Sequence, residues 1–494
     1  MSVAVYTLAA SVILLFLRSL FSRRSLRSIP TVGGPSAPLL SYIGAYNYVH
    51  NSVAILQEGT FKIPMLSRWL VVVTGFMLVD EVQKLSDDQV SFREASGELS
   101  SVKYIFSPAV RQNPYHIGII RQQLTRSLAM LFPEIIDEIA TAFEELVPCT
   151  TTDWTGIDAL GTARRIVSRT SNRVFLGLPY CRNEEYLQIL LGVAAAIARG
   201  RIWIDFFPQL LKPLAAKAIT NIDSRVDDGI RCLHELLYNR IRETEKFGDD
   251  WSDRPNDMLQ WIIDEERKTG SINIRTVVQM LFLINFVAIH TSTNSFTHAL
   301  YHVAANSEYQ EQLRGEIEAV VRTEGWTKAA MGKMRKLDSF MRESQRLNGI
   351  NGVALKRMVI QDLTLCDGTF LPAGTIFVTP VHAMHSDEDN YTNPDDFDPW
   401  RFSNIRATEG EDLKHHYVST STDYISFGLG RHACPGRFFA ANELKAMLAH
   451  VIMNYDVKFE NEGVRPRNKW FGMSLVPDPT ARVLFRKRQT SSTM

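Results

Sequence analysis

The run Ser426-Phe427-Gly428-Leu429-Gly430-Arg431-His432-Ala433-Cys434-Pro435-Gly436 stands near the C-terminus, just before a helical pattern. A cysteine that holds a metal macrocycle from one side needs such a loop, because backbone amides can then point at the sulfur and stabilise the thiolate. Glycines have no Cβ, so a flat macrocycle can lie against the backbone. An aromatic residue keeps water away from the sulfur. The helix that follows directs the positive end of its dipole at the sulfur. The residues that meet these needs in order are Phe427, Gly430, Cys434 and Gly436.

Two simpler interpretations of Cys434 compete with this one. Most lone cysteines are buried small hydrophobes, but a chance F-x-x-G-x-x-x-C-x-G match in a chain of this composition has a probability of roughly one in a thousand. Zinc is disfavoured because no second Cys or His pair sits at ligand spacing. His432 lies two residues from Cys434, too close in a loop to be an obvious second ligand.

Composition excludes several classes of protein. The chain has 494 residues with 54 Lys+Arg against 54 Asp+Glu, so it offers no general field for nucleic acid, and we expect no nucleic-acid partner. A content of 45% hydrophobic and 22% charged residues is not that of a disordered chain. The five cysteines are few, odd in number and far apart, which argues against a disulfide framework and favours a reducing compartment.

The N-terminus predicts a membrane anchor. Residues 1–17 carry no charge, and Arg18 can extend the apolar span to about 20 residues, enough to cross a bilayer. The basic cluster after it predicts a single-pass protein whose remaining chain is cytosolic. We expect the anchor over 1–22 and a Pro/Gly connector over 23–40. The alternative, a cleaved signal peptide, is disfavoured by the missing basic n-region and cleavage site.

The pattern of apolar residues predicts that the body of the chain is mainly helical. From about 115 to 345 apolar residues recur at helical spacing, and the longest pattern, 273–305, is apolar around its whole circumference near its middle, as a buried central helix would be. Strand-like runs are expected at 69–73, 76–79 and within 362–377, and a last helix over 442–455. The prediction is a mainly α protein with a minor β-sheet, in one large domain over 41–494.

With these features the chain resembles the cytochrome P-450 superfamily of haem-thiolate monooxygenases, and most closely its fungal membrane-bound members. The resemblance covers nearly the whole chain and implies the cytochrome P-450 fold, with the long central helix over the haem. Phe427 to Gly436 matches the haem-binding loop, which implies haem b (iron protoporphyrin IX) with Cys434 as the axial iron ligand. The family often has Arg near a haem propionate where this chain has His432.

Two further segments match the family's structural network. Glu343-Ser344-Gln345-Arg346 matches its E-x-x-R helix motif, and 397–402 resembles its P-x-R-F segment, whose arginine is Arg401 here. Glu343 and Arg346 stand three apart and can pair on one helix face. A surface ion pair is the alternative for this common pattern. The resemblance implies a buried Glu343–Arg346–Arg401 network that fixes the loop beneath the haem.

The distal side is expected on the long helix, where Val287 to Ser292 falls at the family's [A/G]-G-x-[D/E]-T-[T/S] motif. Thr291 aligns with the oxygen-handling threonine, and Ser292 is its alternative. His290 replaces the usual acid, which leaves the proton route open. The competing interpretation of Thr291 is a helix threonine bonded to a carbonyl one turn back.

Weaker assignments follow from the resemblance. Arg121 and Arg357 are propionate candidates, although Ile117 stands where the family has tryptophan. The alternative for each arginine is a solvated cation. The predicted substrate pocket is apolar with no evident charged anchor; its residues are Phe106, Ile284, Val287, Ala288, Val353, Ala354, Met473 and Leu475.

The function implied by the resemblance is monooxygenation of a lipophilic small molecule, a terpenoid or other fungal secondary metabolite, with O2. Because no second nucleotide-binding unit follows the catalytic domain, electrons are expected from an NADPH–cytochrome P-450 reductase at the endoplasmic reticulum membrane. Two alternatives stay open: a haem-thiolate isomerase or dehydratase that uses no external electrons, and a non-catalytic haem-binding sensor.

Overall fold

The computed structural model describes residues 26, 28–34, 43–48, 55, 60–65 and 68–489. The predicted anchor over 1–22 lies outside these residues, as does much of the predicted connector. The described part of the connector is extended and irregular, as expected for its prolines and glycines. It lies along the first strand, where the Val32 amide donates to the Lys62 carbonyl at 3.1 Å.

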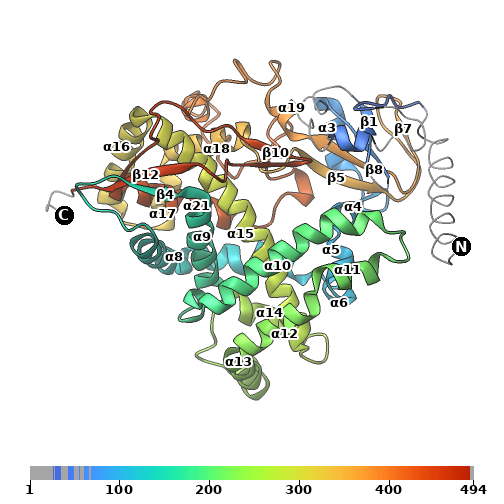
Figure 1. The fold of residues 1–494 in the computed structure, drawn as a ribbon, viewed down its shortest axis with the longest axis horizontal. Coiled ribbons are helices and arrows are strands. Elements are labelled where there is room, and N and C mark those ends of the chain that lie inside the picture. Colours follow the sequence, from blue (N-terminus) through green and yellow to red (C-terminus); the bar gives the residue numbers. More distant parts are fainter. Residues whose placement is uncertain are drawn as a thin grey trace, which may run out of the picture.

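Helices make up most of the described chain, which confirms the predicted mainly α fold (Figure 1). They are α3 (Phe76–Lys84), α4 (Phe92–Ser100), α5 (Val102–Ile105), α6 (Pro108–Gln112), α7 (Tyr115–Ile119), α8 (Thr125–Leu146), α9 (Ala159–Phe175), α10 (Glu184–Trp203), α11 (Lys212–Thr220), α12 (Ile222–Cys232), α13 (His234–Phe247), α14 (Met258–Arg267), α15 (Ile274–Ala305), α16 (Ser307–Glu324), α17 (Lys328–Lys333), α18 (Arg335–Leu347), α19 (Val381–His385), α20 (Arg401–Ile405) and α21 (Arg437–Asn454).

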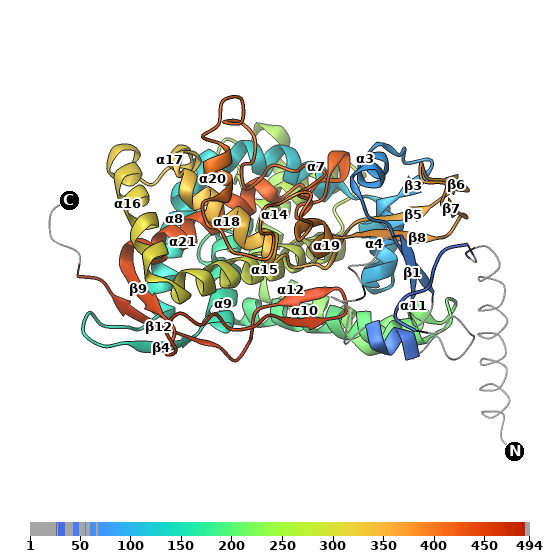
Figure 2. The same ribbon diagram turned by 90° about the horizontal axis from the view of Figure 1, so that it is seen from above.

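The long central helix is α15, with the bounds that the sequence predicts. The Asn273 side chain caps its first turn by accepting from the amides of Arg275 and Thr276. It crosses the middle of the molecule, where α9, α10, α14, α18 and α21 pack against it (Figures 1 and 2). Both halves of the helix are buried nearly all round, as its apolar composition requires.

The strands form small sheets at two sides of the helical body. A five-stranded sheet has the order β1-β2-β8-β5-β3, and a three-stranded antiparallel sheet has the order β4-β12-β9. The hairpins β6–β7 and β10–β11 are separate. The bounds are β1 (Phe61–Pro64), β2 (Trp69–Val72), β3 (Val90–Ser91), β4 (Thr155–Asp158), β5 (Val353–Val359), β6 (Leu363–Thr364), β7 (Phe370–Leu371), β8 (Ile376–Pro380), β9 (Tyr455–Lys458), β10 (Lys469–Phe471), β11 (Ser474–Val476) and β12 (Arg482–Lys487).

One expected strand is wrong. The run 76–79 lies in helix α3, not in a strand. Gly75, at a φ of 96°, turns the chain out of β2 and precedes the helix. Leu78, Val79 and Val82 are buried at helical spacing, so the apolar run belongs to an amphipathic helix. The last helix also begins earlier than expected, at Arg437.

Within the described residues, two helical stretches are long and apolar enough to cross a bilayer, Glu184–Phe206 and Ile274–Ala305. The second is the central helix α15, whose apolar surface is covered by other helices of the domain. Its hydrophobicity is therefore explained by burial in the core.

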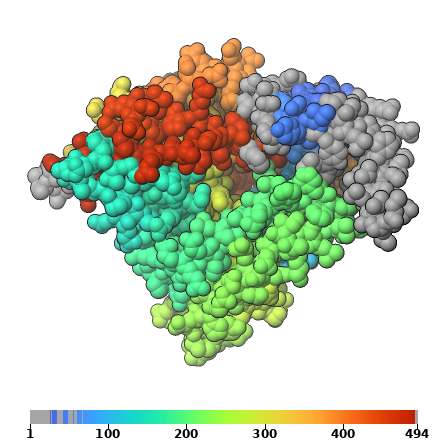
Figure 3. All heavy atoms as spheres, in the orientation of Figure 1, coloured from blue at the N-terminus to red at the C-terminus, as the bar shows by residue number. Residues whose placement is uncertain are grey.

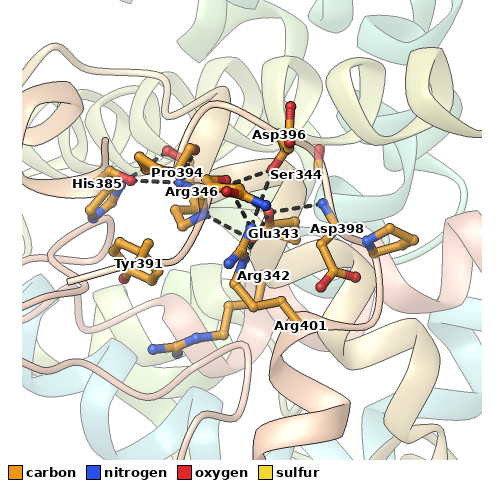
Figure 4. Close-up of polar contacts among 12 residues, drawn as sticks. Arg342, Glu343, Ser344, Arg346, His385, Tyr391, Pro394, Asp396, Asp398 and Arg401 are labelled. Carbon is orange, nitrogen blue, oxygen red and sulfur yellow. Dashed lines mark hydrogen bonds and ion pairs between the residues drawn. The ribbon is translucent and has the colours of Figure 1, made fainter. Parts of the chain in front are cut away.

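A buried ion network fixes the segment before α20. Glu343 and Arg346 lie on α18 with fully buried side chains, and Arg346 donates to both carboxylate oxygens of Glu343 at 2.8 Å (Figure 4). Arg401 donates to the same carboxylate at 3.1 Å. The two arginines also bond backbone carbonyls, which belong to His385, Thr392, Asn393, Pro394 and Asp396. One carboxylate therefore organises an irregular stretch that has no sheet or helix to satisfy its backbone.

His385 extends this network to the cysteine loop. Its carbonyl accepts from Arg346 at 2.6 Å, and its Nδ1 lies 3.1 Å from the Arg346 carbonyl. Burial lowers the pKa of His385 to about 3, so the ring is neutral. With its proton on Nδ1, its Nε2 accepts from the Ile425 amide at 3.1 Å. The Ile425 carbonyl then accepts from the Gly428 amide at 2.8 Å.

A second buried acid joins α9, α15 and α21. Glu443 is fully buried, and the Ser171 hydroxyl donates to it at 2.8 Å. Burial raises its pKa from an ordinary 4.5 to about 8, while the hydroxyls of Ser171 and Ser292 act in the opposite direction. Glu443 is therefore protonated at neutral pH.

Glu343→Gln should destabilise the fold strongly, because two buried guanidinium groups lose their counter-charge. We expect a loss of about 3–5 kcal/mol in the free energy of unfolding, measured by urea unfolding followed by circular dichroism. Asp228→Asn, which removes an exposed i,i+3 ion pair with Arg231, should cost at most about 1 kcal/mol. Equal effects of the two changes would show that the Glu343 network is not a stabilising element.

Glu443 should make stability fall as pH rises. Its protonated form is favoured in the folded state, so its contribution is complete below its ordinary pKa and is lost as pH rises through about 8. Between about pH 5 and pH 9 the unfolding midpoint of the wild type should fall relative to that of Glu443→Gln, which cannot titrate. Parallel curves for the two proteins would contradict this assignment.

Candidate functional site

The cysteine loop is closed by a backbone hydrogen bond. The Cys434 amide donates to the Phe427 carbonyl at 2.7 Å, and a single turn of 3-10 helix (Gly430–His432) fills the loop. Gly428 and Gly430 have φ of 74° and 63°, in the left-handed region that favours glycine. Sequence reasoning missed Gly428, although its presence in a tight loop was a usable signal. Gly436 has φ of −87° and directly precedes α21.

The Cys434 sulfur lies at the start of α21. Burial raises the pKa of its thiol, while the amides of Gly436 and Arg437 and the Arg437 charge favour the thiolate. The Phe427 ring packs edge-on against the buried Tyr417 ring at 5.5 Å. The loop thus holds one half-buried sulfur with backbone amides directed at it, which suits a soft metal ligand.

One face of α15 is accessible to solvent in the middle of this otherwise buried helix; its residues Val287, Ala288 and Thr291 are called the stripe below. Val287 is 52% exposed in the middle of this core helix, and Ala288 and Thr291 beside it are half-buried. These residues follow the spacing of one helix face. The surface is hollowed between the C-terminal segment and α10, with atoms of α15 at the base of the hollow (Figure 3). A face of this kind needs a bound group to cover it.

The three candidate catalytic residues point in different directions. The Thr291 hydroxyl donates to the Val287 carbonyl at 2.8 Å, which leaves its lone pairs open on the stripe. His290 lies on the α10 side of the helix against Phe286, and burial lowers its pKa to about 4. Ser292 is buried next to Glu443 of α21. The structure therefore does not bring His290 and Ser292 onto the stripe with Thr291.

A cluster of cationic and polar groups lies beside the cysteine loop. Arg357 of β5 is buried, and among the described residues it forms no ion pair. Its guanidinium lies over the Phe92 ring, which also stacks on His432. His432 contacts Asp87 at 3.0 Å, and burial and the Arg357 charge lower the pKa of its imidazole. An uncompensated buried guanidinium is the residue type that a bound carboxylate would satisfy.

Two more residues belong near this loop. Arg121 is exposed and donates to the carbonyl of Arg431, so it braces the loop from the α7 side. His116 was missed by sequence reasoning; within the described chain its buried Nδ1 has no hydrogen-bond partner. Burial lowers the pKa of His116 to about 4.

The predicted pocket residues fall into two groups. Phe106 and Ile284 are buried in the main helical core, beside the stripe residues Val287 and Ala288. The remaining four residues come from β5 and the β10–β11 hairpin. Val353 and Met473 belong to a second buried cluster. Ala354 and Leu475 are their neighbours in sequence. The Gly352 amide donates to the Met473 carbonyl at 2.7 Å and ties these two segments together.

These residues fit a flat, anionic metal macrocycle. Cys434 supplies a sulfur from a loop free of bulky Cβ atoms at Gly428 and Gly430, and Arg357 supplies a buried cation that lacks an anion in the described structure. The stripe on α15 supplies an uncovered apolar face. Groups of three or more His, Cys, Asp or Glu side chains that could hold a bare metal ion do not occur among the described residues.

Comparison with known proteins agrees with this chemistry. The Cytochrome P450 family model matches residues 39–485. The chain is 47% identical to Cytochrome P450 monooxygenase 151 of Postia placenta over 99% of both chains. It is 33% identical to Cytochrome P450 monooxygenase CYP512U6 of Ganoderma lucidum over 95% of this chain and 93% of that one.

Solved structures show the same fold. The crystal structure of the cytochrome P450DA heme domain superposes with a TM-score of 0.68 at 17% sequence identity, over 93% of this chain and 98% of that one. The family match spans the described fold from the strand β1 to the strand β12, and the fungal relatives align end to end. The chain therefore belongs to the cytochrome P450 family of haem-dependent monooxygenases.

Proposed function

We propose that Cys434 is the axial ligand of haem b and that the enzyme hydroxylates, or otherwise oxidises, a lipophilic terpenoid or other fungal secondary metabolite. The observation that carries this proposal is the half-buried Cys434 sulfur, held just before α21 by a closed glycine loop. A thiolate-ligated haem supplies oxygen activation when bound. Arg357, His432 and Arg121, with the loop residues Phe427, Gly430 and Gly436, would hold its propionates and its face.

The protein contributes binding and proton control. The α15 stripe with Val287 and Ala288 would lie against the reacting face and exclude water, and the Thr291 oxygen can accept a hydrogen bond from water there. Neutral His290 is turned toward α10, so it does not supply the charged acid that usually stands at its position. We infer that Thr291 organises the proton delivery. Ser292 does not face the stripe and acts only through the adjacent Thr291.

The proposal includes a source of electrons and a place in the cell. An NADPH–cytochrome P-450 reductase would supply the electrons, and the predominantly apolar residues 1–22 would anchor the enzyme in the endoplasmic reticulum membrane with the catalytic domain cytosolic. Fungal relatives with the same monooxygenase name support the assignment of the reaction class. Metabolite profiling of a host that expresses this chain with a reductase would identify the substrate, and NADPH-independent turnover would favour an isomerase instead.

Cys434→Ala should abolish the absorption band that the reduced CO complex of a thiolate-ligated haem shows. The exposed Cys366→Ala serves as the matched control and should keep the band. The measurement is the reduced CO difference spectrum of purified protein. A band that survives in Cys434→Ala would assign the ligand elsewhere.

Thr291→Ala should leave NADPH consumption largely intact and raise hydrogen peroxide formed per NADPH several-fold, because a water bound at the stripe would lose its hydroxyl partner. Thr291→Ser keeps the hydroxyl and should stay close to the wild type. The measurement is NADPH oxidation and peroxide release with reductase present. Unchanged coupling in Thr291→Ala would remove this residue from proton delivery.

A further inference from the structure

Four polar side chains from distant parts of the chain gather on one side of the predicted pocket. Arg201 stands near the end of α10, and its Nη1 donates to the Ser474 hydroxyl of β11 at 3.4 Å. Tyr48, in the helical residues 43–48, shares a buried cluster with Val353 of β5 and with Met473, which directly precedes Ser474. Lys356 lies three residues after Val353 on β5, and burial and the Arg201 charge lower the pKa of its ammonium group. These four residues, Tyr48, Arg201, Lys356 and Ser474, are called the cationic pocket wall below.

In the part of the chain that the structure describes, neither cation of this wall, Lys356 or Arg201, forms an ion pair within 4 Å, although the Asp205 charge acts on Arg201. The acid nearest in sequence, Asp205, is already bound by Lys212 and contacts Arg68 at 3.4 Å. Arg68 also binds Glu98 at 2.6 Å. Positive charge is therefore in excess here, although the chain as a whole is neutral.

Arg201 and Lys356 are surrounded by protein and are still reached by solvent. Desolvation lowers the pKa of Lys356 to about 8 and lowers that of Arg201, as expected for groups surrounded by protein. Both residues are nevertheless reached by solvent, since Arg201 is exposed and Lys356 is half-buried. The Tyr48 side chain is 1% exposed, and its hydroxyl has no hydrogen-bond partner in the described structure. Unpaired buried donors of this kind favour an acceptor ligand.

The cationic pocket wall adjoins the apolar pocket and is separate from the cluster at the cysteine loop. Ser474 lies between Met473 and Leu475, and Lys356 follows Val353 and Ala354 on β5. Arg357, next on the strand, contacts Phe92 beside the cysteine loop instead. The hollow between α10 and the C-terminal segment opens toward α15 (Figure 3). An anion held at this wall would place an attached apolar skeleton toward the α15 stripe.

We propose that the cationic pocket wall binds the carboxylate of the substrate, which is therefore a lipophilic carboxylic acid. This inference rests on the proposed function for the reaction, and it differs from the prediction of a pocket without a charged anchor. The Arg201 guanidinium and the Lys356 ammonium donate charge-assisted hydrogen bonds to the carboxylate, and the Tyr48 hydroxyl donates a third. The apolar remainder packs against Val353, Met473 and Val287.

The test compares each acid with its methyl ester, which keeps the skeleton and loses the charge. The probes are palmitic acid and oleanolic acid with their methyl esters, so that a linear and a polycyclic skeleton are distinguished. Binding to the purified haem protein is measured by equilibrium dialysis. We expect at least one acid to bind about tenfold to a hundredfold more tightly than its ester, as charge-assisted hydrogen bonds allow.

Three variants assign that preference to the wall. Lys356→Met and Arg201→Gln should each remove most of the acid preference, and the conservative Tyr48→Phe should reduce it several-fold without altering packing. Lys217→Met is the matched control, because it removes an exposed lysine of α11 and should keep the preference. Ester affinity should stay within about twofold throughout.

The outcomes separate this inference from the proposed function. Equal binding of acid and ester by the wild type, or an unchanged preference in both Lys356→Met and Tyr48→Phe, would overturn the carboxylate site even if the CO complex shows thiolate ligation. A retained acid preference in protein whose CO complex lacks the thiolate band would leave the site standing and remove the proposed haem ligand.

Discussion

A single buried carboxylate, that of Glu343, sets the geometry on which the cysteine loop depends. It neutralises Arg346 and Arg401, which in turn bond the carbonyls of an irregular segment. From Arg346 the connection continues through the neutral ring of His385 to the amide of Ile425, at the start of the loop. Buried charges are costly unless they are paired and hydrogen-bonded. In this protein the hydrogen bonds that satisfy the two arginines also fix the irregular backbone before α20, which no helix or sheet holds in place.

The two faces of the site are built by different means. The cysteine side is a loop whose shape follows from left-handed glycines and a hydrogen bond across the loop. The expected distal side is the helix α15, held in the core by the helices that pack around it. A loop can present amides to a sulfur, while a helix gives a flat apolar surface that resists deformation.

Much of this arrangement could be predicted from the sequence. The loop motif, the central helix and the pairing of Glu343 with Arg346 follow from local spacing, because glycine, cysteine and i,i+3 charges have strong local preferences. Arg401 is distant in sequence from Glu343 and was expected only from the family resemblance. The strand expected at 76–79 was wrong because a four-residue apolar run is common to short strands and amphipathic helices. His385 and the direction of His290 depend on tertiary packing and leave no local signal. The same holds for Arg201 and Lys356, which meet only after folding.

The claim that everything else depends on is a bond between the Cys434 sulfur and a haem iron. Iron K-edge X-ray absorption of the purified haem-loaded protein tests it directly, since it reports the atoms bound to the metal. The account predicts one sulfur in the first shell of the wild type and of Cys181→Ala, and none in Cys434→Ala. A first shell of nitrogen and oxygen alone in the wild type, or a sulfur that persists in Cys434→Ala, would contradict it.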